Sequence, residues 1–339
     1  MNRKIRWIIW VILLSFIGIL IYLPGGGEWY AKNIYPIYFS GFSFISSFFP
    51  FSLGDSTIVV LVIALGWGII RNKGLKNRLL SALETLVVTF VWVYLAWTVN
   101  YFRADFYSRT GFERQKFSEE QFGQFLERYT ENLNETYCEI DTISYQLVDQ
   151  TIKSGYNSLD SKYGLLKPSD RFRPKPMLFN WVQSSVGVLG YFNPFFTEYH
   201  LNRDLLPSQY ASVYAHEMSH VLGVSSEAEA NFYGYKMCTE SSVQEIRFSG
   251  YFGLFPYVLS TVRRAFPEEK RKAWLKTIRP EILKLYNEKC DHWESLRKST
   301  LDKVQSKVYD LHLKTNGIRT GLANYGEVIG LVIAAEEAE

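Results

Sequence analysis

Three long apolar runs near the beginning of the chain limit most strongly what it can fold into. Residues 7–23 form a run of 17 residues without a charge, and 56–70 form a second uncharged run. Residues 79–101 form a third, which only Glu84 interrupts, near its start. Each approaches the roughly 20 residues that cross the hydrocarbon core of a bilayer as a helix. We therefore predict three N-terminal transmembrane helices.

The first run also has features of a cleaved signal peptide, because Arg3, Lys4 and Arg6 precede it. It ends, however, in "LPGGGEWY" rather than in a small-x-small cleavage site, and two further apolar runs follow. We expect a retained anchor rather than a signal peptide.

The basic residues indicate how the chain is oriented. "RNKGLKNR" (71–78) carries four positive charges, as the N-terminus is also basic, whereas the segment between the first two runs has only Glu28, Lys32 and Asp55. The positive-inside rule then places both basic stretches in the cytoplasm and everything after the third run outside. We predict a multi-pass membrane protein, with a membrane anchor over 1–102 and an extracytoplasmic domain over 103–339.

The charge balance agrees with this division. Residues 1–102 hold 8 Lys/Arg against 3 Asp/Glu, or +5, and residues 103–339 hold the remaining 29 against 31, or −2. The overall charge of +3 is thus an orientation signal, and no basic surface indicates nucleic-acid binding.

The segment "YPIYFSGFSFISSFFPFSLGD" (35–55) is apolar but contains Pro36, Gly41 and Pro50. A re-entrant segment or part of a fourth span is conceivable. We expect an interfacial hairpin, because prolines and serines interrupt it and a fourth span would reverse the charge pattern.

We predict that the rest of the chain has an α+β fold that is mainly helical. Phe122, Phe125, Leu126 and Tyr129 recur at helical spacing, and 166–176 is a proline-punctuated loop. The residues after that loop, "MLFNWVQSSVGVLGYFNPFFTEYHLN", are rich in Val, Gly and aromatics, which predicts strands joined by turns. The strand from Val186 to Phe196 either presents an edge to an extended peptide or lies in the interior.

One stretch, "YAHEMSHVLGVSSEAEANFYGYKMC" (214–238), carries the chemistry. We expect the helix that contains its histidines to begin at Pro207. His216 and His220 are four residues apart, so both lie on one face of the helix and both can reach one tetrahedral Zn²⁺. Glu217 is placed to take a proton from zinc-bound water. The alternative is an ordinary helix with incidental histidines.

The residues that follow favour zinc. Gly223 suits the end of the helix, and Ser226 with Glu229 three residues later predicts a capping box that starts a new helix. Glu227 in its first turn is our predicted third ligand, with Glu229 as the competing one. Asn231, one turn further, is expected to orient a ligand histidine. Three protein ligands and an open position are typical of catalytic zinc.

These residues resemble the gluzincin zinc peptidases. "E-x-x-A-N" (227–231) looks like the gluzincin glutamate helix, in which the first glutamate binds zinc and the residue four later supports a histidine. Thermolysin and the CAAX prenyl proteases have Asp at that last position, so Asn231 is a departure.

The whole chain is similar to the bacterial membrane-protein family called domain of unknown function 3810. The matching pieces are "FPFSLGD", "WTVNYFR", "GYFNPFFTEYHLN", "HEMSHVLGVSSEAEAN", "IRFSGY" and "VYDLHLKTN". The resemblance implies a zinc metallopeptidase anchored in the bacterial cytoplasmic membrane, without an established substrate.

Other residues have weaker claims. Arg247 and Tyr251 in "RFSGY" are candidate oxyanion donors, or part of a helix-breaking turn with one packed aromatic. His200 is expected in a surface turn rather than at a cleft edge, and His292 and His312 on helix surfaces. Three cysteines, 138, 238 and 290, allow one disulfide and one free thiol, or none.

The expected function is hydrolysis of peptide bonds in an unidentified peptide or protein, with Zn²⁺ on His216, His220 and Glu227 and with Glu217 as general base. The alternative is a non-catalytic envelope protein in which zinc is structural or a partner is bound. Cleavage of peptide bonds within the bilayer is a third hypothesis. It is less favoured, because the motif lies more than 100 residues beyond the last apolar run.

Overall fold

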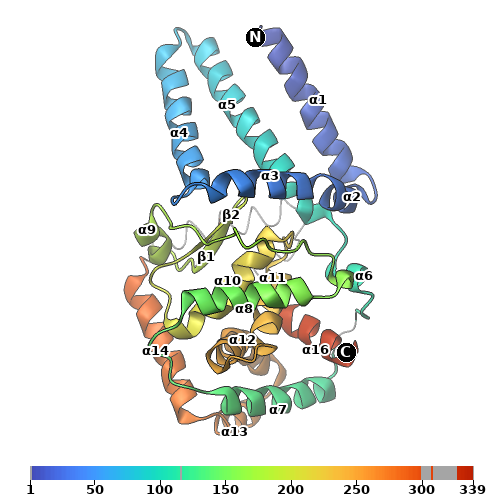
Figure 1. Cartoon of the computed structure of the whole chain (residues 1–339), viewed down its shortest axis with the longest axis vertical. Helices are drawn as coiled ribbons and strands as arrows, with labels where there is room; N and C mark the ends of the chain where they lie inside the picture. The colour runs from blue at the N-terminus through green and yellow to red at the C-terminus, as the bar shows by residue number, and fades with distance from the viewer. Residues whose placement is uncertain (1, 115–116, 299–306, 308–326, 339) are drawn as a thin grey trace. The chain divides into compact units, whose positions relative to one another are not determined.

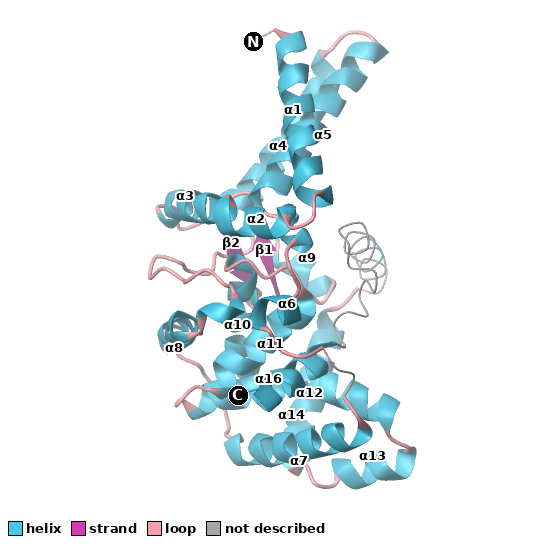
Figure 2. Cartoon of the chain, turned by 90° about the vertical axis from the view of Figure 1, so that its right-hand side faces the viewer, coloured by secondary structure: helices cyan, strands magenta, loops and turns pink. Residues whose placement is uncertain are grey.

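The structure is a computed structural model that describes residues 2–114, 117–298, 307 and 327–338. It is mainly helical, as predicted, with one two-stranded sheet among the described residues (Figures 1 and 2). The elements in chain order are α1 Arg3–Tyr22, α2 Gly26–Asn33, α3 Tyr35–Ser47, α4 Leu53–Arg71, α5 Leu75–Ala96, η1 Thr98–Phe102, α6 Phe106–Thr110, α7 Glu119–Thr136, α8 Tyr145–Ser158, η2 Ser161–Tyr163, α9 Asn180–Ser185, β1 Gly190–Asn193, β2 Glu198–Leu201, α10 Pro207–Val221, α11 Glu227–Thr239, α12 Gln244–Ala265, α13 Glu268–Leu275, α14 Pro280–Leu296 and α16 Val328–Ala338.

The chain forms two compact units. The first contains residues 1–104 together with two later segments, 171–178 and 192–200. The second contains 105–170, 179–191 and 201–339.

Three helices of the first unit are long and apolar enough to cross a membrane: Lys4–Tyr22, Leu53–Arg71 and Leu75–Ala96. The first predicted run extends one residue beyond its helix, and the second falls within its helix. The third helix begins earlier and ends earlier than 79–101. Residues 98–102 form the 3₁₀ helix η1 instead. Few side chains of the three helices are buried inside the protein, as expected for surfaces that contact lipid.

Glu84, the acidic residue within the third long helix, is paired with a basic residue of the first. Arg6 on α1 forms a two-pronged ion pair with Glu84 on α5, with Nε 2.6 Å from one carboxylate oxygen and Nη2 3.0 Å from the other. A charged side chain within an apolar helix is costly unless it is paired, and here the pair joins two helices.

The segment after α2 differs from the prediction. Residues 35–47 form one 13-residue helix, α3, rather than a hairpin. Pro36 does not break this helix because it lies in the first turn, where a missing N–H costs nothing. Gly41 does not break it either; it lies within the helix, and a Cβ there would meet no neighbour within 4 Å. Figure 1 shows α2 and α3 running across the ends of the three long helices.

In the second unit, α10, α11 and α12 pack closely around one another. Small residues allow this: a Cβ at Gly234 on α11 would lie 3.1 Å from the Ser212 carbonyl on α10, and one at Gly253 on α12 would lie 2.8 Å from the Ser212 side chain. The predicted amphipathic helix is α7, and its four periodic residues Phe122, Phe125, Leu126 and Tyr129 are all buried. α16 contributes a further buried apolar face.

Two local predictions are wrong. The stretch expected to be strands contains only the short pair β1 and β2, because Asn180–Ser185 is helical; Ser184 and Asn180 are held there by side-chain hydrogen bonds to Asn202 and Asp204. Tertiary hydrogen bonding outweighs local composition here. One of the two alternatives for "RFSGY", a helix-breaking turn, is also wrong, because the segment lies inside α12, where Gly250 packs against Cys238 and Thr239.

Candidate metal centre

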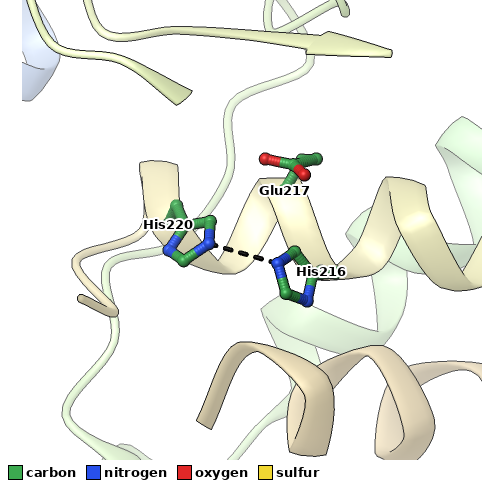
Figure 3. Close-up of side chains that lie close together, drawn as sticks. All are labelled: His216, Glu217 and His220. Carbon is green, nitrogen blue, oxygen red and sulfur yellow. Dashed lines mark hydrogen bonds between the residues drawn. The ribbon is translucent and has the colours of Figure 1, made fainter. Parts of the chain in front are cut away.

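Two imidazoles face each other on α10. This helix begins at Pro207, as the sequence predicts, and carries His216 and His220 one turn apart. Their Nε2 atoms are 3.2 Å apart (Figure 3). The cluster is mostly enclosed, since the two side chains are only 16% and 10% exposed.

Each ring is fixed by a bond at its other nitrogen. Nδ1 of His216 lies 3.1 Å from the side-chain oxygen of Asn231 on α11, the contact that the sequence pattern predicts. Nδ1 of His220 lies 2.8 Å from the carbonyl of Val224. Because both partners are oxygen acceptors, both Nδ1 atoms carry the proton, and both Nε2 lone pairs point toward the same place.

A third donor comes from the start of the next helix. Gly223 has a positive φ of 108°, which lets the chain turn after α10, and Ser226 caps α11 by accepting from the backbone N–H of Glu229. Glu227 is then the first residue of α11. Its carboxylate oxygens lie 3.3 Å from Nε2 of His216 and 3.7 Å from Nε2 of His220.

These distances fit one tetrahedral metal ion. Zinc bonds of about 2.0–2.1 Å at tetrahedral angles separate neighbouring ligand atoms by about 3.3 Å. The N–N distance of 3.2 Å and the shorter N–O distance of 3.3 Å match this separation between ligand atoms. The longer N–O distance, 3.7 Å, is slightly greater, and a small movement of the side chain would correct it. Two neutral imidazoles and a carboxylate are also a donor set that zinc prefers.

Glu217 lies beside the same cluster. Ligand-capable atoms of His216, Glu217 and His220 all fall within 4.8 Å of one another. Both glutamates are thus near the nitrogens, and we favour Glu227 as the ligand because its oxygens lie 3.3 Å and 3.7 Å from the two Nε2 atoms. In Figure 3 the Glu217 carboxylate points away from the line that joins the two rings.

The carboxylate of Glu217 is buried and incompletely bonded. The residue is 4% exposed, and its Oε2 has no hydrogen-bond partner among the described residues. Burial raises the pKa of Glu217 to about 8, the neighbouring Glu227 adds to this, and His216 opposes it. A buried oxygen without a partner leaves a position for a water or a substrate group.

The pKa values of the two histidines are shifted in opposite directions. Burial alone lowers the pKa of His216, but the adjacent carboxylates of Glu227 and Glu217 outweigh it and raise that pKa. For His220, burial prevails and lowers the pKa, although Glu227 opposes it. The carboxylates thus concentrate negative charge where a cation would be held.

A comparison with known families matches almost the whole chain. The model of the family described as "Protein of unknown function (DUF3810)" matches residues 30–333. The chain belongs to this family. Searches of the curated proteins and of the solved structures gave no match. The family description assigns no activity to this DUF3810 chain.

The competing glutamate has another partner. Glu229 forms an ion pair with Arg109, whose side chain is only 4% exposed and also donates to the carbonyl of Tyr163. This contact gives Glu229 a structural role at the first turn of α11.

Tyr257 is a site residue that the sequence did not reveal. It lies on the face of α12 that also carries Ser249 and Gly253 toward α10. Burial raises the pKa of its hydroxyl, with a contribution from the nearby Glu227, and Asn231 opposes the shift. Its phenol therefore stays protonated as a hydrogen-bond donor close to the cluster.

Gly190 is a second residue beside the cluster that was not predicted from the sequence. A Cβ at this position would come within 2.5 Å of Oε1 of Glu217, so the backbone of β1 begins directly against that carboxylate. A glycine at a strand end is a signal for such a close approach, and the sequence contained it.

The remaining predicted residues are not brought to the cluster by any described contact. The Tyr251 ring packs against Tyr129 and Tyr235. Nε of Arg247 is buried without a hydrogen-bond partner among the described residues. The expectation that His200 lies in a surface turn is wrong: it is fully buried in β2, 4.0 Å from Asp55 in the first unit.

His292, on α14, is half-buried and bonds to the carbonyl of Asp204. His312 and the motif at 308–316 lie outside the described residues. Cys138, Cys238 and Cys290 are all free thiols.

Proposed function

We propose that this chain is a membrane-anchored zinc metallopeptidase with a gluzincin-like site. The observation that carries the proposal is the convergence of three donors: two Nε2 atoms 3.2 Å apart and the Glu227 carboxylate 3.3 Å and 3.7 Å from them. Hydrogen bonds at both Nδ1 atoms fix this arrangement before any metal binds. In this proposal His216, His220 and Glu227 would hold Zn²⁺, which would supply Lewis-acid chemistry at the peptide carbonyl.

Glu217 is the proposed general base and acid. Its unpaired Oε2 accepts a proton from the attacking water, and the resulting carboxylic acid donates that proton to the leaving amine. Burial supports this role, because it brings the pKa of the carboxyl group close to the range in which a group can both accept and release a proton at neutral pH.

Tyr257 and Gly190 complete the proposed site. The Tyr257 phenol is available to donate a hydrogen bond to the oxyanion that develops on the substrate, in place of the Arg247 and Tyr251 suggested by sequence. The extended backbone at Gly190 beside the base suits a peptide substrate, since peptides commonly pair with a strand edge.

The location of the proposed site follows from the charge pattern. With both basic stretches in the cytoplasm, α10 and α11 are placed on the extracytoplasmic side of the bacterial cytoplasmic membrane. The substrates are then peptides or proteins of that compartment or of the membrane surface.

A structural zinc is the second candidate, and one observation favours it. Glu217, His220 and Glu227 are all buried, and closed sites are typical of zinc that only stabilises a fold. In that case the chain would bind zinc without cleaving peptides.

The test uses the full chain purified in detergent. We expect about one zinc per chain, and almost none in His216→Ala, with cleavage of a proteome-derived peptide library by the wild type alone. Zinc without cleavage would favour the structural role, and a wild type without zinc would contradict both candidates.

A further inference from the structure

The surface of α3 carries an apolar stripe that faces away from the rest of the first unit. Its exposed residues, at helical spacing, are Ile37, Ser40, Gly41, Phe44, Ile45 and Phe48, of which only Ser40 has a polar side chain. Ile37 is 73% exposed and Phe48 is 68% exposed. No charged residue occurs between 34 and 54. A surface of this kind is rare on a protein face that contacts water.

The opposite face of the same helix is packed. Tyr35, Phe39 and Ser46 are buried. The Tyr35 ring contacts Trp97 at a centroid distance of 5.4 Å, and Phe39 contacts Phe172 at 4.9 Å. The orientation of α3 about its own axis is therefore fixed, and the stripe is its outer side.

The stripe continues into the turn that leads to α4. Phe49 and Phe51 are also exposed, and α4 begins two residues after Phe51. Since α4 is long and apolar enough to span a bilayer, its first turn marks the boundary between the hydrocarbon and the headgroups. Aromatic side chains concentrate at that boundary in membrane proteins.

The polar backbone groups of this turn are bonded to protein. Glu198 is 2% exposed and accepts hydrogen bonds from the N–H groups of Leu53 and Gly54, at 3.1 Å and 2.8 Å, and from the hydroxyls of Ser46 and Ser52. Lys175 donates to the carbonyls of Ser46 and Phe49. Backbone groups that lie in lipid need such internal partners, because water does not supply them there.

From these contacts we infer that α3 and the Phe48–Phe51 turn lie in the plane of the membrane. The outer stripe occupies the acyl boundary of the leaflet that contains the first turn of α4. The occupant of this surface is the bilayer itself, because the stripe is continuous with a helix of spanning length and contains no charged residue of its own. The guanidinium of Arg171, 5.2 Å from the centre of the Phe44 ring, borders the stripe, as basic side chains do where an apolar surface meets the headgroups. This inference is independent of the metal centre.

The test measures depth in the bilayer. Cys138 and Cys290 are replaced by Ser, the buried Cys238 is kept, and single cysteines are introduced at Phe44 or Phe48 and labelled with an environment-sensitive fluorophore. The full chain is reconstituted in phosphatidylcholine–phosphatidylglycerol vesicles that carry spin labels at shallow or deep acyl positions. Ile63→Cys in the middle of α4 and Lys284→Cys on α14 are the matched controls, since both side chains are well exposed.

We expect the labels at 44 and 48 to lose more fluorescence to the shallow spin label than to the deep one. Ile63→Cys should show the reverse, and Lys284→Cys should respond only to aqueous iodide. Strong iodide quenching at 44 and 48 would overturn the inference, as would stronger quenching by the deep label. Protection from all quenchers together with 48-to-48 cross-linking would assign the stripe to a second copy and would also overturn it.

Discussion

Gly190 lies so close to Glu217 that the two cannot tolerate an added methyl group between them. A Cβ at residue 190 would lie 2.5 Å from Oε1 and 2.6 Å from Cγ of the glutamate. The φ angle of Gly190 is not positive, so an alanine fits the backbone itself and only the carboxylate has to move.

Gly190→Ala is therefore expected to displace the proposed base without disturbing the proposed ligands. Misplacing a catalytic group by about 1 Å commonly costs about 100-fold in rate. Peptide cleavage should fall by about that factor while zinc content, measured by mass spectrometry, stays unchanged. Gly123→Ala on α7 is the control, because a Cβ there meets nothing within 4 Å. Equal activities for the two variants would remove Glu217 from the reaction.

Glu229→Ala tests the division of roles between the two glutamates of α11. Removing this carboxylate leaves the buried Arg109 without its partner, which commonly costs about 3–5 kcal/mol of folding free energy. This loss is larger than the removal of a helix cap alone, at about 1 kcal/mol. Thermal unfolding should show the loss while the folded protein keeps its zinc, and Glu227→Ala should show the opposite pattern. Loss of zinc only in Glu229→Ala would mean that Glu229, and not Glu227, is the third ligand.

The pair between Arg6 and Glu84 predicts a charge-dependent association of α1 with α5. Arg6→Gln and Glu84→Gln should each lower the melting temperature of the detergent-solubilised chain, because each leaves one charge without its partner. The exchanged variant, Arg6→Glu with Glu84→Arg, should recover part of the loss. Lys4→Gln removes the same charge from an exposed side chain and serves as control. An exchanged variant that is less stable than both single variants would argue against the pairing.

The orientation of the chain is tested with reporter fusions. If both basic stretches are cytoplasmic, a reporter that is active only outside the cytoplasm should work when fused after residue 110 and fail when fused at Lys76. The reverse activities would place the metal centre in the cytoplasm.

The structural features that depend on local residue spacing were predicted correctly from the sequence. The apolar runs, the start of α10 at Pro207 and the cap of α11 at Ser226 are all short-range features, and the structure confirms each. His216 and His220 also face each other as their spacing implies, because the helix itself determines that geometry.

What the sequence did not show depends on contacts between distant residues. Tyr257 is 30 residues beyond Glu227, and Glu198 is more than 140 residues beyond the turn that it caps. Arg109 could not be matched to Glu229 across 120 residues, so the role of that glutamate was read from its local cap alone. The helix at 180–185 was missed because Asn202 and Asp204, which bond to it, follow it in the chain.

Glu217→Gln tests the central claim most directly. The amide keeps the size of the side chain but has no basicity, so it neither accepts the proton of water nor returns one to the amine, and the loss of a general base commonly costs about two to four orders of magnitude in rate. The account predicts full zinc content, an unchanged melting temperature and peptide cleavage reduced by about that factor relative to the wild type. Wild-type cleavage rates in Glu217→Gln, with zinc retained, would contradict it.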